Sequence, residues 1–193
     1  MGRHRQFDID KALDEVLCVF WRKGYEGASY SDLVDAAGVE RPALYSAFGN
    51  KESMFRKALT RYSERYMDFI PVALGLPTAR EAVAHFLYET VNLNTRYAGH
   101  TGCLGVNGVL AGSDDAEPVR QALIDFRAAG QRHFRERFER AKSEGDLPVT
   151  VDPDGLATFV LTIAHGIAVQ AKAGADSDAL RAVVQQALAG WPR

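Results

Sequence analysis

The residues of this chain that could do recognisable chemistry gather in the short stretch RPALYSAFGNKE, residues 41–52. Arg41 and Ser46 carry hydrogen-bonding groups of the kind that read base edges in a DNA groove. The hydroxyl of Tyr45 and the ammonium of Lys51 suit phosphate oxygens. This combination indicates contact with nucleic acid, provided that the backbone presents all four side chains on one surface.

Two short helices joined by a tight turn would present them. The sequence ASYSDLVDAAGV predicts a first helix that is capped by Ser29, with Asp32 three residues on, and that ends at Gly38. A second helix is predicted over residues 42–48, where Pro42 costs nothing in the first turn. This arrangement is a helix-turn-helix candidate, whose second helix enters the major groove.

The spacing within the second helix separates a buried face from an outward one. Leu44 and Phe48 lie four residues apart and are expected to face the core. The outward side then carries Arg41, Ala43, Tyr45, Ser46 and Ala47, the alanines being small enough for a groove to approach. The alternative is that Tyr45 and Phe48 both pack a three-helix core; for Phe48 we accept that interpretation.

The patterns that an enzyme needs are missing from the sequence. We find no nucleophile paired with a base, no Gly-rich phosphate loop and no metal-ligand spacing among the histidines, which are His4, His85, His100, His133 and His165. We therefore expect no enzymatic activity, no metal and no cofactor. A helical protein-interaction module without DNA binding is the more serious alternative.

Composition is compatible with a soluble intracellular protein. The chain has 193 residues, 47% of them hydrophobic, and a net charge of −2. Residues 1–66 hold 11 Lys and Arg against 10 Asp and Glu, and residues 67–193 hold 12 against 15, so the front is the less acidic part. Cys18 and Cys103 form no disulfide framework. With no secretory signal, and with the longest apolar run (156–171) too short for a span, we expect a cytoplasmic protein without a membrane partner.

Helical periodicity recurs throughout, so the fold class is predicted to be all-α. A small three-helix head is expected over residues 1–50 and a larger helical body over 51–193, with a helix near 51–70 connecting them. Gly24 should stop the first helix. The expected helices of the head and connection are 9–23, 29–37, 42–48 and 51–70; those of the body are 79–97, 103–112, 116–143, 153–173 and 176–190.

Residues 19–55 resemble the DNA-binding head of the TetR family of bacterial transcriptional regulators. The shared features are an apolar first helix ending in Lys-Gly-Tyr (23–25), the Ser29 cap, Ala-Ala-Gly-Val (36–39), and Leu-Tyr-x-x-Phe (44–48) followed by Lys51-Glu52. Gly102-Cys103-Leu104 with Asn107, and the C-terminal AKAGADSDALRAVVQQAL, resemble one branch of that family.

The resemblance implies roles for individual head residues. Arg41, Ala43 and Ser46 would contact bases, while phosphates would be held by Ser29, Tyr30, Tyr45 and Lys51. The chain departs from the usual family pattern at Glu40, Pro42, Ser46, Ala47 and Gly49, with fewer cations than is common. Glu40 could contact a cytosine amino group or cap the second helix; we favour the cap.

The resemblance also implies a dimeric, ligand-responsive repressor that binds an inverted-repeat operator and is released by a small molecule. Helix 153–173 is apolar most of the way round and, with helix 176–190, could form a two-fold interface, although a buried helix within one chain would look similar. Candidate ligand contacts are Tyr88, Asn92, Tyr97, Asn107, His133 and His165, each of which alone is more often a core or surface residue.

Cys103 is a further candidate within the body. At the start of a short helix, with Lys172 as a conceivable cationic neighbour, its thiol could be activated and make the protein a redox or electrophile sensor. The alternative is a small buried hydrophobic residue, the usual fate of a free cysteine.

Overall fold

The computed structural model of the chain describes residues 8–97, 99–107 and 116–192, and within these ranges all regular structure is helical. The prediction of an all-α fold is confirmed. The helices are α1 (Ile9–Gly27), α2 (Tyr30–Ala37), α3 (Arg41–Phe48), α4 (Lys51–Tyr66), α5 (Phe69–Leu74), α6 (Ala79–Arg96), α7 (Leu104–Asn107), α8 (Glu117–Ser143), α9 (Pro153–Lys172) and α10 (Ser177–Ala189).

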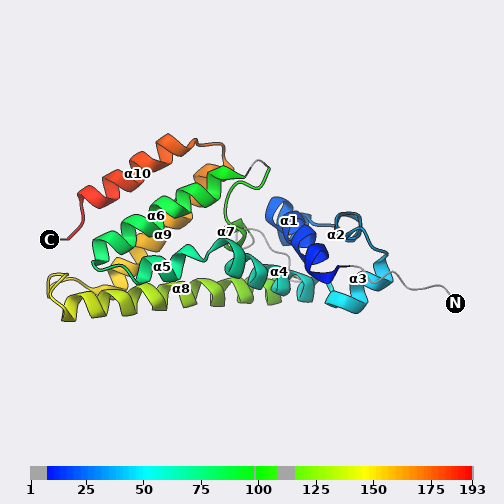
Figure 1. Ribbon diagram of the computed structural model, residues 1–193, viewed down its shortest axis with the longest axis horizontal. Helices are drawn as coiled ribbons and strands as arrows, with labels where there is room; N and C mark the ends of the chain where they lie inside the picture. The colour runs from blue at the N-terminus through cyan, green and yellow to red at the C-terminus, as the bar shows by residue number, and fades with distance from the viewer. Residues whose placement is uncertain (1–7, 98, 108–115, 193) are drawn as a thin grey trace.

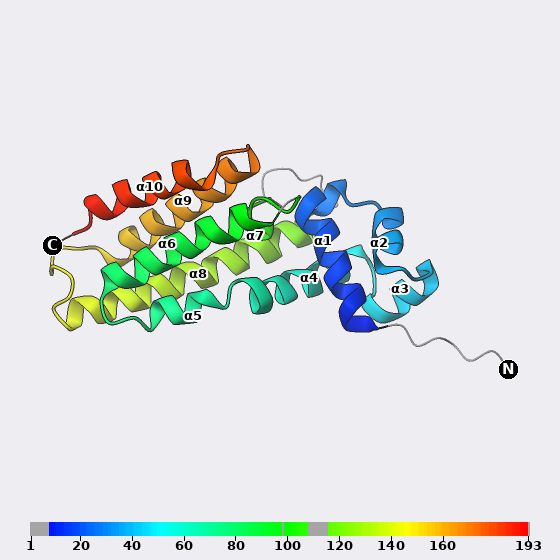
Figure 2. The same ribbon diagram turned by 45° about the horizontal axis from the view of Figure 1, so that its top comes forward.

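The molecule is elongated, with α1, α2 and α3 at one end and the long helices α6, α8, α9 and α10 at the other (Figure 1). In this article the head is α1–α3 and the body is α5–α10. The helix α4 runs between them and packs against α1. The described residues begin in the head and end beside the body, at opposite ends of the molecule (Figure 2).

Aromatic packing holds α1 against α4. Phe20 and Phe55 meet edge to face, with ring centroids 5.2 Å apart, and both are fully buried. Outside this core, ion pairs of Arg61 with Asp10 and of Arg65 with Asp14 join the same two helices. The apolar contacts supply most of the stability, since exposed ion pairs contribute only about 0–1 kcal/mol each.

Caps and glycines set the boundaries of the head helices. Ser29 and Asp32 form the predicted capping box at the start of α2. Gly38 ends α2 in the left-handed region (φ 65°), and its N–H donates to the carbonyls of Val34 and Asp35. Gly24, expected to stop α1, instead introduces a kink (φ 71°), beyond which helical geometry continues to Gly27.

The long helices of the body enclose an apolar core of their own. The helix α9 packs against α6, α8 and α10, and α6 also packs against α10. Phe86 of α6 contacts Phe134 of α8 with ring centroids 4.6 Å apart, and both rings are buried. Trp191, just after α10, packs against Phe138 and closes this core at the C-terminal end.

The single helix predicted near 51–70 is wrong, because α4 ends at Tyr66 and α5 begins at Phe69. Pro71 explains the break. Proline has no N–H to donate to the carbonyl of Met67, and its ring would clash with that carbonyl in a continuous helix. Of the helix predicted over 103–112, residues 104–107 form α7, Cys103 precedes it, and residues 108–112 lie outside the described residues.

The apolar character of α9 has a structural explanation. By length and composition it is the one helix in the described part of the chain that could cross a membrane, with a mean hydropathy of 1.3. The apolar run of residues 156–171 is part of this 20-residue helix, and Thr, His and Gln side chains interrupt its apolar character. A core helix of a soluble protein passes the same test, and α9 packs against α6, α8 and α10.

Candidate DNA interface and effector cavity

The helix α3 is anchored by two side chains and leaves the rest of its surface available. Leu44 and Phe48 are buried, as their spacing predicted. Arg41 and Ser46 are exposed, while Ala43, Tyr45 and Ala47 are half-buried. The predicted outward side of α3 is therefore accessible at Arg41 and Ser46, but the Tyr45 side chain is half-buried, where the sequence indicated an exposed one.

Tyr45 is held by two other candidate DNA contacts. Its ring stacks on that of Tyr30 from α2, with centroids 5.4 Å apart and planes 26° apart. The guanidinium of Arg41 lies over both rings, 4.8 Å from the centroid of Tyr30, and donates a hydrogen bond of 3.2 Å to the Tyr45 hydroxyl. The hydrogen bonds from Tyr30 and Arg41 lower the pKa of Tyr45, while the bond to Tyr45 raises that of Tyr30. The cluster fixes Arg41 before any DNA is present.

Ser29 is committed to local structure. Its hydroxyl accepts from the backbone N–H of Asp32 at 3.1 Å and donates to the Asp32 carboxylate at 2.8 Å. Lys23 donates to the same carboxylate at 2.6 Å. These bonds, that from Lys23 first, hold the pKa of Asp32 well below its usual range. A phosphate contact by Ser29 would have to compete with this network.

Lys51 and Glu40 flank α3 at its two ends. The ammonium of Lys51 lies 4.7 Å from the centroid of the Tyr25 ring, and burial lowers its pKa. Glu40 occupies the N-cap position of α3, but its side chain makes no capping hydrogen bond, so the predicted cap is wrong. A glutamate side chain is longer than the Ser, Thr, Asp and Asn side chains favoured at that position.

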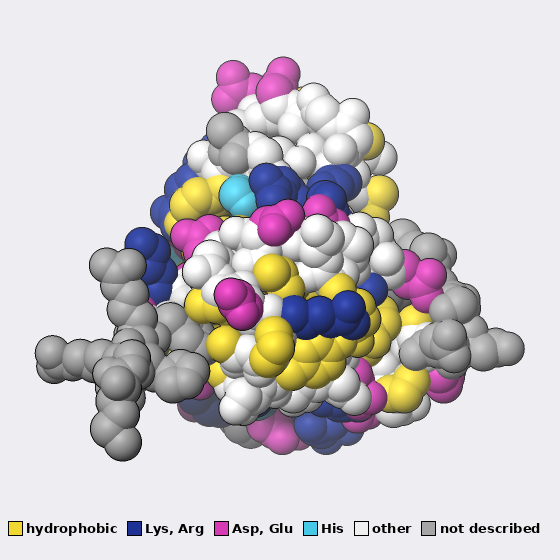
Figure 3. Space-filling model, turned by 90° about the vertical axis from the view of Figure 1, so that its right-hand side faces the viewer, with side chains coloured by type: hydrophobic (Ala, Val, Ile, Leu, Met, Phe, Trp, Pro, Cys, Tyr) yellow, Lys and Arg dark blue, Asp and Glu magenta, His cyan; other side chains and the backbone are white. Residues whose placement is uncertain are grey.

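The head end of the molecule carries no continuous basic patch in the view of Figure 3. Lys and Arg side chains are scattered there among hydrophobic and acidic ones. Non-specific attraction to DNA scales with the number of phosphates neutralised. Base contacts by side chains such as Arg41 must then supply more of the preference for the operator over unrelated DNA.

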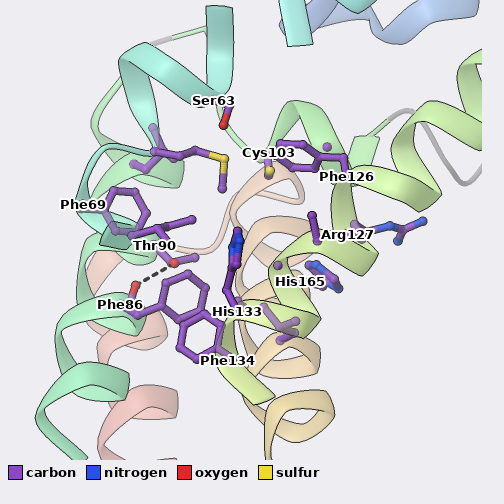
Figure 4. A pocket seen from close by; sticks show the side chains of 18 of the residues that line it. Ser63, Phe69, Phe86, Thr90, Cys103, Phe126, Arg127, His133, Phe134 and His165 are labelled. Atoms are coloured by element: carbon purple, nitrogen blue, oxygen red, sulfur yellow. Dashed lines mark hydrogen bonds between the residues drawn. The ribbon is translucent and has the colours of Figure 1, made fainter. Parts of the chain in front are cut away.

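A cavity of about 680 Å³ opens within the body, between α4–α5 on one side and α6, α8 and α9 on the other. Its lining is mostly apolar. Figure 4 shows Cys103, His133 and His165 projecting around this space from the start of α7, from α8 and from α9. The apolar lining includes Met67, Phe69, Ile70, Phe86, Leu93, Val106, Phe126, Phe134, Leu161 and Ala164.

Three predicted ligand contacts therefore line the cavity, namely Cys103, His133 and His165. Tyr88 and Asn92 do not, because they lie on the side of α6 that faces α10. There Arg181 donates to Asn92 at 2.6 Å and lies over the Tyr88 ring. Tyr97 instead packs against Trp21 and Tyr66. The helix α7 ends at Asn107, whose side chain lies outside the described part of the structure.

The sequence analysis missed Thr90, Asn94 and Arg127 in the lining. The helical spacing along α6 was sufficient to identify Thr90 and Asn94. Phe86, Thr90 and Asn94 repeat every four residues on one face, whereas Tyr88 and Asn92 repeat on another. Because Phe86 packs in the core, Thr90 and Asn94, which share its face, are the pair that this spacing predicts to face inward.

Cys103 lies in the cavity wall, but its thiol is not activated. Burial raises its pKa, outweighing the hydrogen bonds from the backbone of Gly105 and Val106. Lys172, the conceivable neighbour, donates to the carbonyl of Arg22 at 3.2 Å instead. Burial also raises the pKa of the Cys18 thiol. The raised pKa favours the interpretation of Cys103 as a packed residue over that of an activated thiolate, because the cost of burying charge opposes the help from the helix terminus.

The outer face of α9 and α10 combines exposed apolar side chains with small residues. Phe159 is 48% exposed, Val169 43% and Val183 47%. Gly166 and Ala182 between them are also exposed. Small residues let two helices approach closely, and contiguous exposed apolar surface is typical of an interaction site.

A helix-turn-helix head with a pre-positioned arginine, joined to a helical body with an apolar cavity, defines a DNA-binding transcriptional regulator. Two family descriptions match the chain: "Bacterial regulatory proteins, tetR family" over residues 13–58 and "Tetracyclin repressor-like, C-terminal domain" over residues 79–187. The chain belongs to the TetR family, as the sequence motifs indicated.

Individual relatives cover nearly the whole chain. The HTH-type transcriptional repressor ComR of Escherichia coli K12 is 31% identical over 193 residues, which are 99% of this chain and 92% of ComR. A solved structure of a cysteine mutant of the TetR family regulator CifR, complexed with 26-bp double-strand operator DNA, is 44% identical with a TM-score of 0.94. It covers 99% of this chain and is itself covered completely. The repressor NemR of Escherichia coli K12 is 25% identical over 64% of this chain and 63% of its own length.

Proposed function

We propose that this protein is a cytoplasmic repressor that binds an inverted-repeat operator as a homodimer and releases it when a small molecule occupies the body cavity. It acts by binding and catalyses no reaction. DNA binding belongs to residues 1–50 and effector binding and dimerisation to residues 51–193, with α4 as the connection. The observation that carries the proposal is the exposed face of α3 with Arg41 fixed on it.

The contacts with DNA divide into two kinds. Arg41, Ala43 and Ser46 face bases, and the phosphates are held by Ser29, Tyr30, Tyr45 and Lys51. The operator-bound CifR mutant supports this placement by its overall likeness to the chain. A dimer places two copies of α3 about one helical turn of DNA (about 34–36 Å) or a multiple of it apart, so the operator should be an inverted repeat.

Dimerisation through α9 and α10 follows from their exposed apolar face. Two copies related by a two-fold axis would bury Phe159, Val169 and Val183 against the same surface of the partner. The small Gly166 and Ala182 would allow the helices to pack closely. The head would then be carried at the far end of each body, where α3 is free (Figure 1).

A gel-shift assay with DNA flanking the coding region tests the proposal. We expect one shifted species that contains two chains per duplex and is not competed by unrelated DNA. If no flanking or selected duplex shifts at low salt, the interaction-module alternative replaces it. A co-purified small molecule, sought by mass spectrometry of denatured protein, would identify the effector.

A second candidate is a regulator that senses electrophiles through cysteine. It is favoured by the position of Cys103 in the cavity wall, beside apolar side chains that could concentrate a reagent there. The raised pKa of the thiol argues for slow reaction at neutral pH. Brief alkylation with limiting N-ethylmaleimide, followed by mass spectrometry and a DNA-binding assay, decides between the two. Release of DNA that depends on Cys103 and not on Cys18 would favour the sensor.

A further inference from the structure

One polar atom in the cavity lining has no partner. Asn94, in the last turns of α6, is 1% exposed, and its Nδ2 donates to the carbonyl of Thr90 at 2.7 Å. Its Oδ1 is buried and accepts no hydrogen bond from any residue that the structure describes. Most buried polar atoms are paired, and an unsatisfied one costs about 1–3 kcal/mol. A bound molecule could therefore supply the hydrogen-bond donor that no described residue supplies to this oxygen.

The other polar side chain on this face of α6, Thr90, already has a hydrogen-bond partner within the helix. The Thr90 hydroxyl, one turn before Asn94, donates to the carbonyl of Phe86 at 2.8 Å, the bond drawn in Figure 4. The backbone carbonyl of Asn94 accepts from the N–H of Gly102 at 3.3 Å, which places Asn94 beside the segment that leads to Cys103. Asn94 thus lies at the end of the cavity nearest α7.

The charges around the cavity do not favour an ionised ligand. Figure 4 shows the side chain of Arg127 extending away from the other labelled side chains, and Arg127 also lines a second hollow of about 380 Å³ next to α9. Burial and the nearby Arg127 lower the pKa of His165, which favours its uncharged form. Glu64 and Asp68 are exposed. Among the described lining residues Arg127 could partner a carboxylate, but it is only half-buried and extends away from the other labelled side chains, so an ionised group deeper in this apolar space would lose its hydration without a partner there.

We propose that the effector is an uncharged, largely apolar molecule carrying one hydroxyl group, and that this hydroxyl donates its hydrogen bond to Oδ1 of Asn94. The inference rests on the proposed function, since it names the ligand class of the same cavity. Apolar surface supplies the affinity, and Asn94 supplies the discrimination between a hydroxyl and an ether or a methyl group.

Three probes of nearly equal size test this class: 4-propylphenol, 4-propylanisole and 4-propylbenzoate. Their binding to the full-length protein is measured by equilibrium dialysis at pH 7 without DNA. We expect the phenol to bind about ten-fold more tightly than the ether, as one net hydrogen bond near the upper end of its usual range would give, and the benzoate to bind most weakly. The ether is the more apolar of the two neutral probes, so burial alone would reverse their order.

Two variants assign the preference to Asn94. Asn94→Leu is close in size and removes the acceptor, and we expect the phenol and the ether to bind it with affinities within about two-fold of each other, as the loss of one net hydrogen bond implies. Thr90→Val is the matched control, because its hydroxyl lines the same cavity but is already bonded within α6. It should keep the ten-fold preference. Thermal unfolding by circular dichroism checks that both variants fold.

Several outcomes would overturn the proposal: an ether that binds wild-type protein as tightly as the phenol, a benzoate that binds best, no binding of any probe at millimolar concentration, or a preference that survives in Asn94→Leu. The wild-type comparison stands even if Asn94→Leu does not fold. Because dialysis uses no DNA, these results are independent of operator binding. Failure of the gel shift would remove the regulatory role and leave the ligand class to be judged by itself.

Discussion

The indole nitrogen of Trp21 in α1 donates a hydrogen bond of 2.6 Å to the carbonyl oxygen of Gly102, the residue before Cys103 in the cavity wall. Trp21 is 1% exposed, and the rings of Tyr62 and Tyr66 pack edge-on against it at 4.8 and 4.9 Å. Gly102 in turn donates to the backbone of Asn94. A head helix and the effector cavity therefore share one buried point of contact.

We expect Trp21→Phe to weaken communication between cavity and head. The phenylalanine keeps apolar bulk but leaves the Gly102 carbonyl without its donor, at a cost of about 1–3 kcal/mol in the free energy of unfolding. A bound ligand that moves Gly102 would then displace α1 less. The measurement is the ratio of DNA dissociation constants with and without 4-propylphenol, which should fall towards one.

Trp191→Phe is the control for this experiment, because Trp191 packs in the body core beside Phe138, away from α1. It should lower stability while leaving the ratio unchanged. A Trp21→Phe protein with the wild-type ratio would show that coupling runs through other contacts.

The dimer interface can be tested at a position that the structure selects. Val183 is 47% exposed on the outer face of α10, whereas its neighbour Val184 is fully buried within the chain. We expect Val183→Glu to give a folded monomer that binds DNA weakly, since each head alone supplies half of the contacts. Light scattering at micromolar concentration measures the mass.

Val149→Glu, at an exposed position (80%) in the turn between α8 and α9, should remain dimeric and serve as the control. If Val183→Glu remains a dimer with unchanged DNA affinity, the interface lies elsewhere on the chain.

The capping box of α2 predicts how the stability of the folded protein changes at low pH. The folded-state pKa of Asp32 is depressed below its usual value of 3.8 by Lys23 and Ser29. Its carboxylate therefore stabilises the folded state above about pH 4, and this contribution disappears as pH falls through the folded pKa. We expect the stability difference between wild type and Asp32→Asn to be constant near neutrality and to shrink below pH 4. Urea unfolding at several pH values measures it; a difference that grows on acidification would contradict the assignment.

Local patterns in the sequence were enough to predict much of the head. The capping box at Ser29, the left-handed Gly38 and the buried pair Leu44 and Phe48 each follow from residues within one or two turns of one another. The same local reasoning placed one helix end near residue 70, whereas Pro71 cannot donate to the carbonyl of Met67 and the chain forms two helices, α4 and α5.

The cavity was harder to predict because it depends on which face of each helix is turned inward. Asn92 and Asn94 are two residues apart and look equivalent in the sequence, yet Asn92 pairs with Arg181 and Asn94 lines the cavity. The stacking of Tyr45 on Tyr30 likewise joins two helices. Such contacts are set by tertiary packing, which spacing along one helix does not reveal.

The central claim is that α3 reads DNA, and Arg41 tests it most directly. Fluorescence anisotropy gives the affinity of wild type, Arg41→Ala and Arg41→Lys for the operator and for a scrambled duplex of equal length. We expect Arg41→Ala to lose about 1–3 kcal/mol on the operator and much less on the scrambled duplex, as a bidentate base contact requires. Arg41→Lys should keep non-specific affinity and lose most of the discrimination, because lysine lacks the planar fork. Equal losses on both duplexes for Arg41→Ala would contradict base reading by Arg41 and assign it to the phosphate backbone.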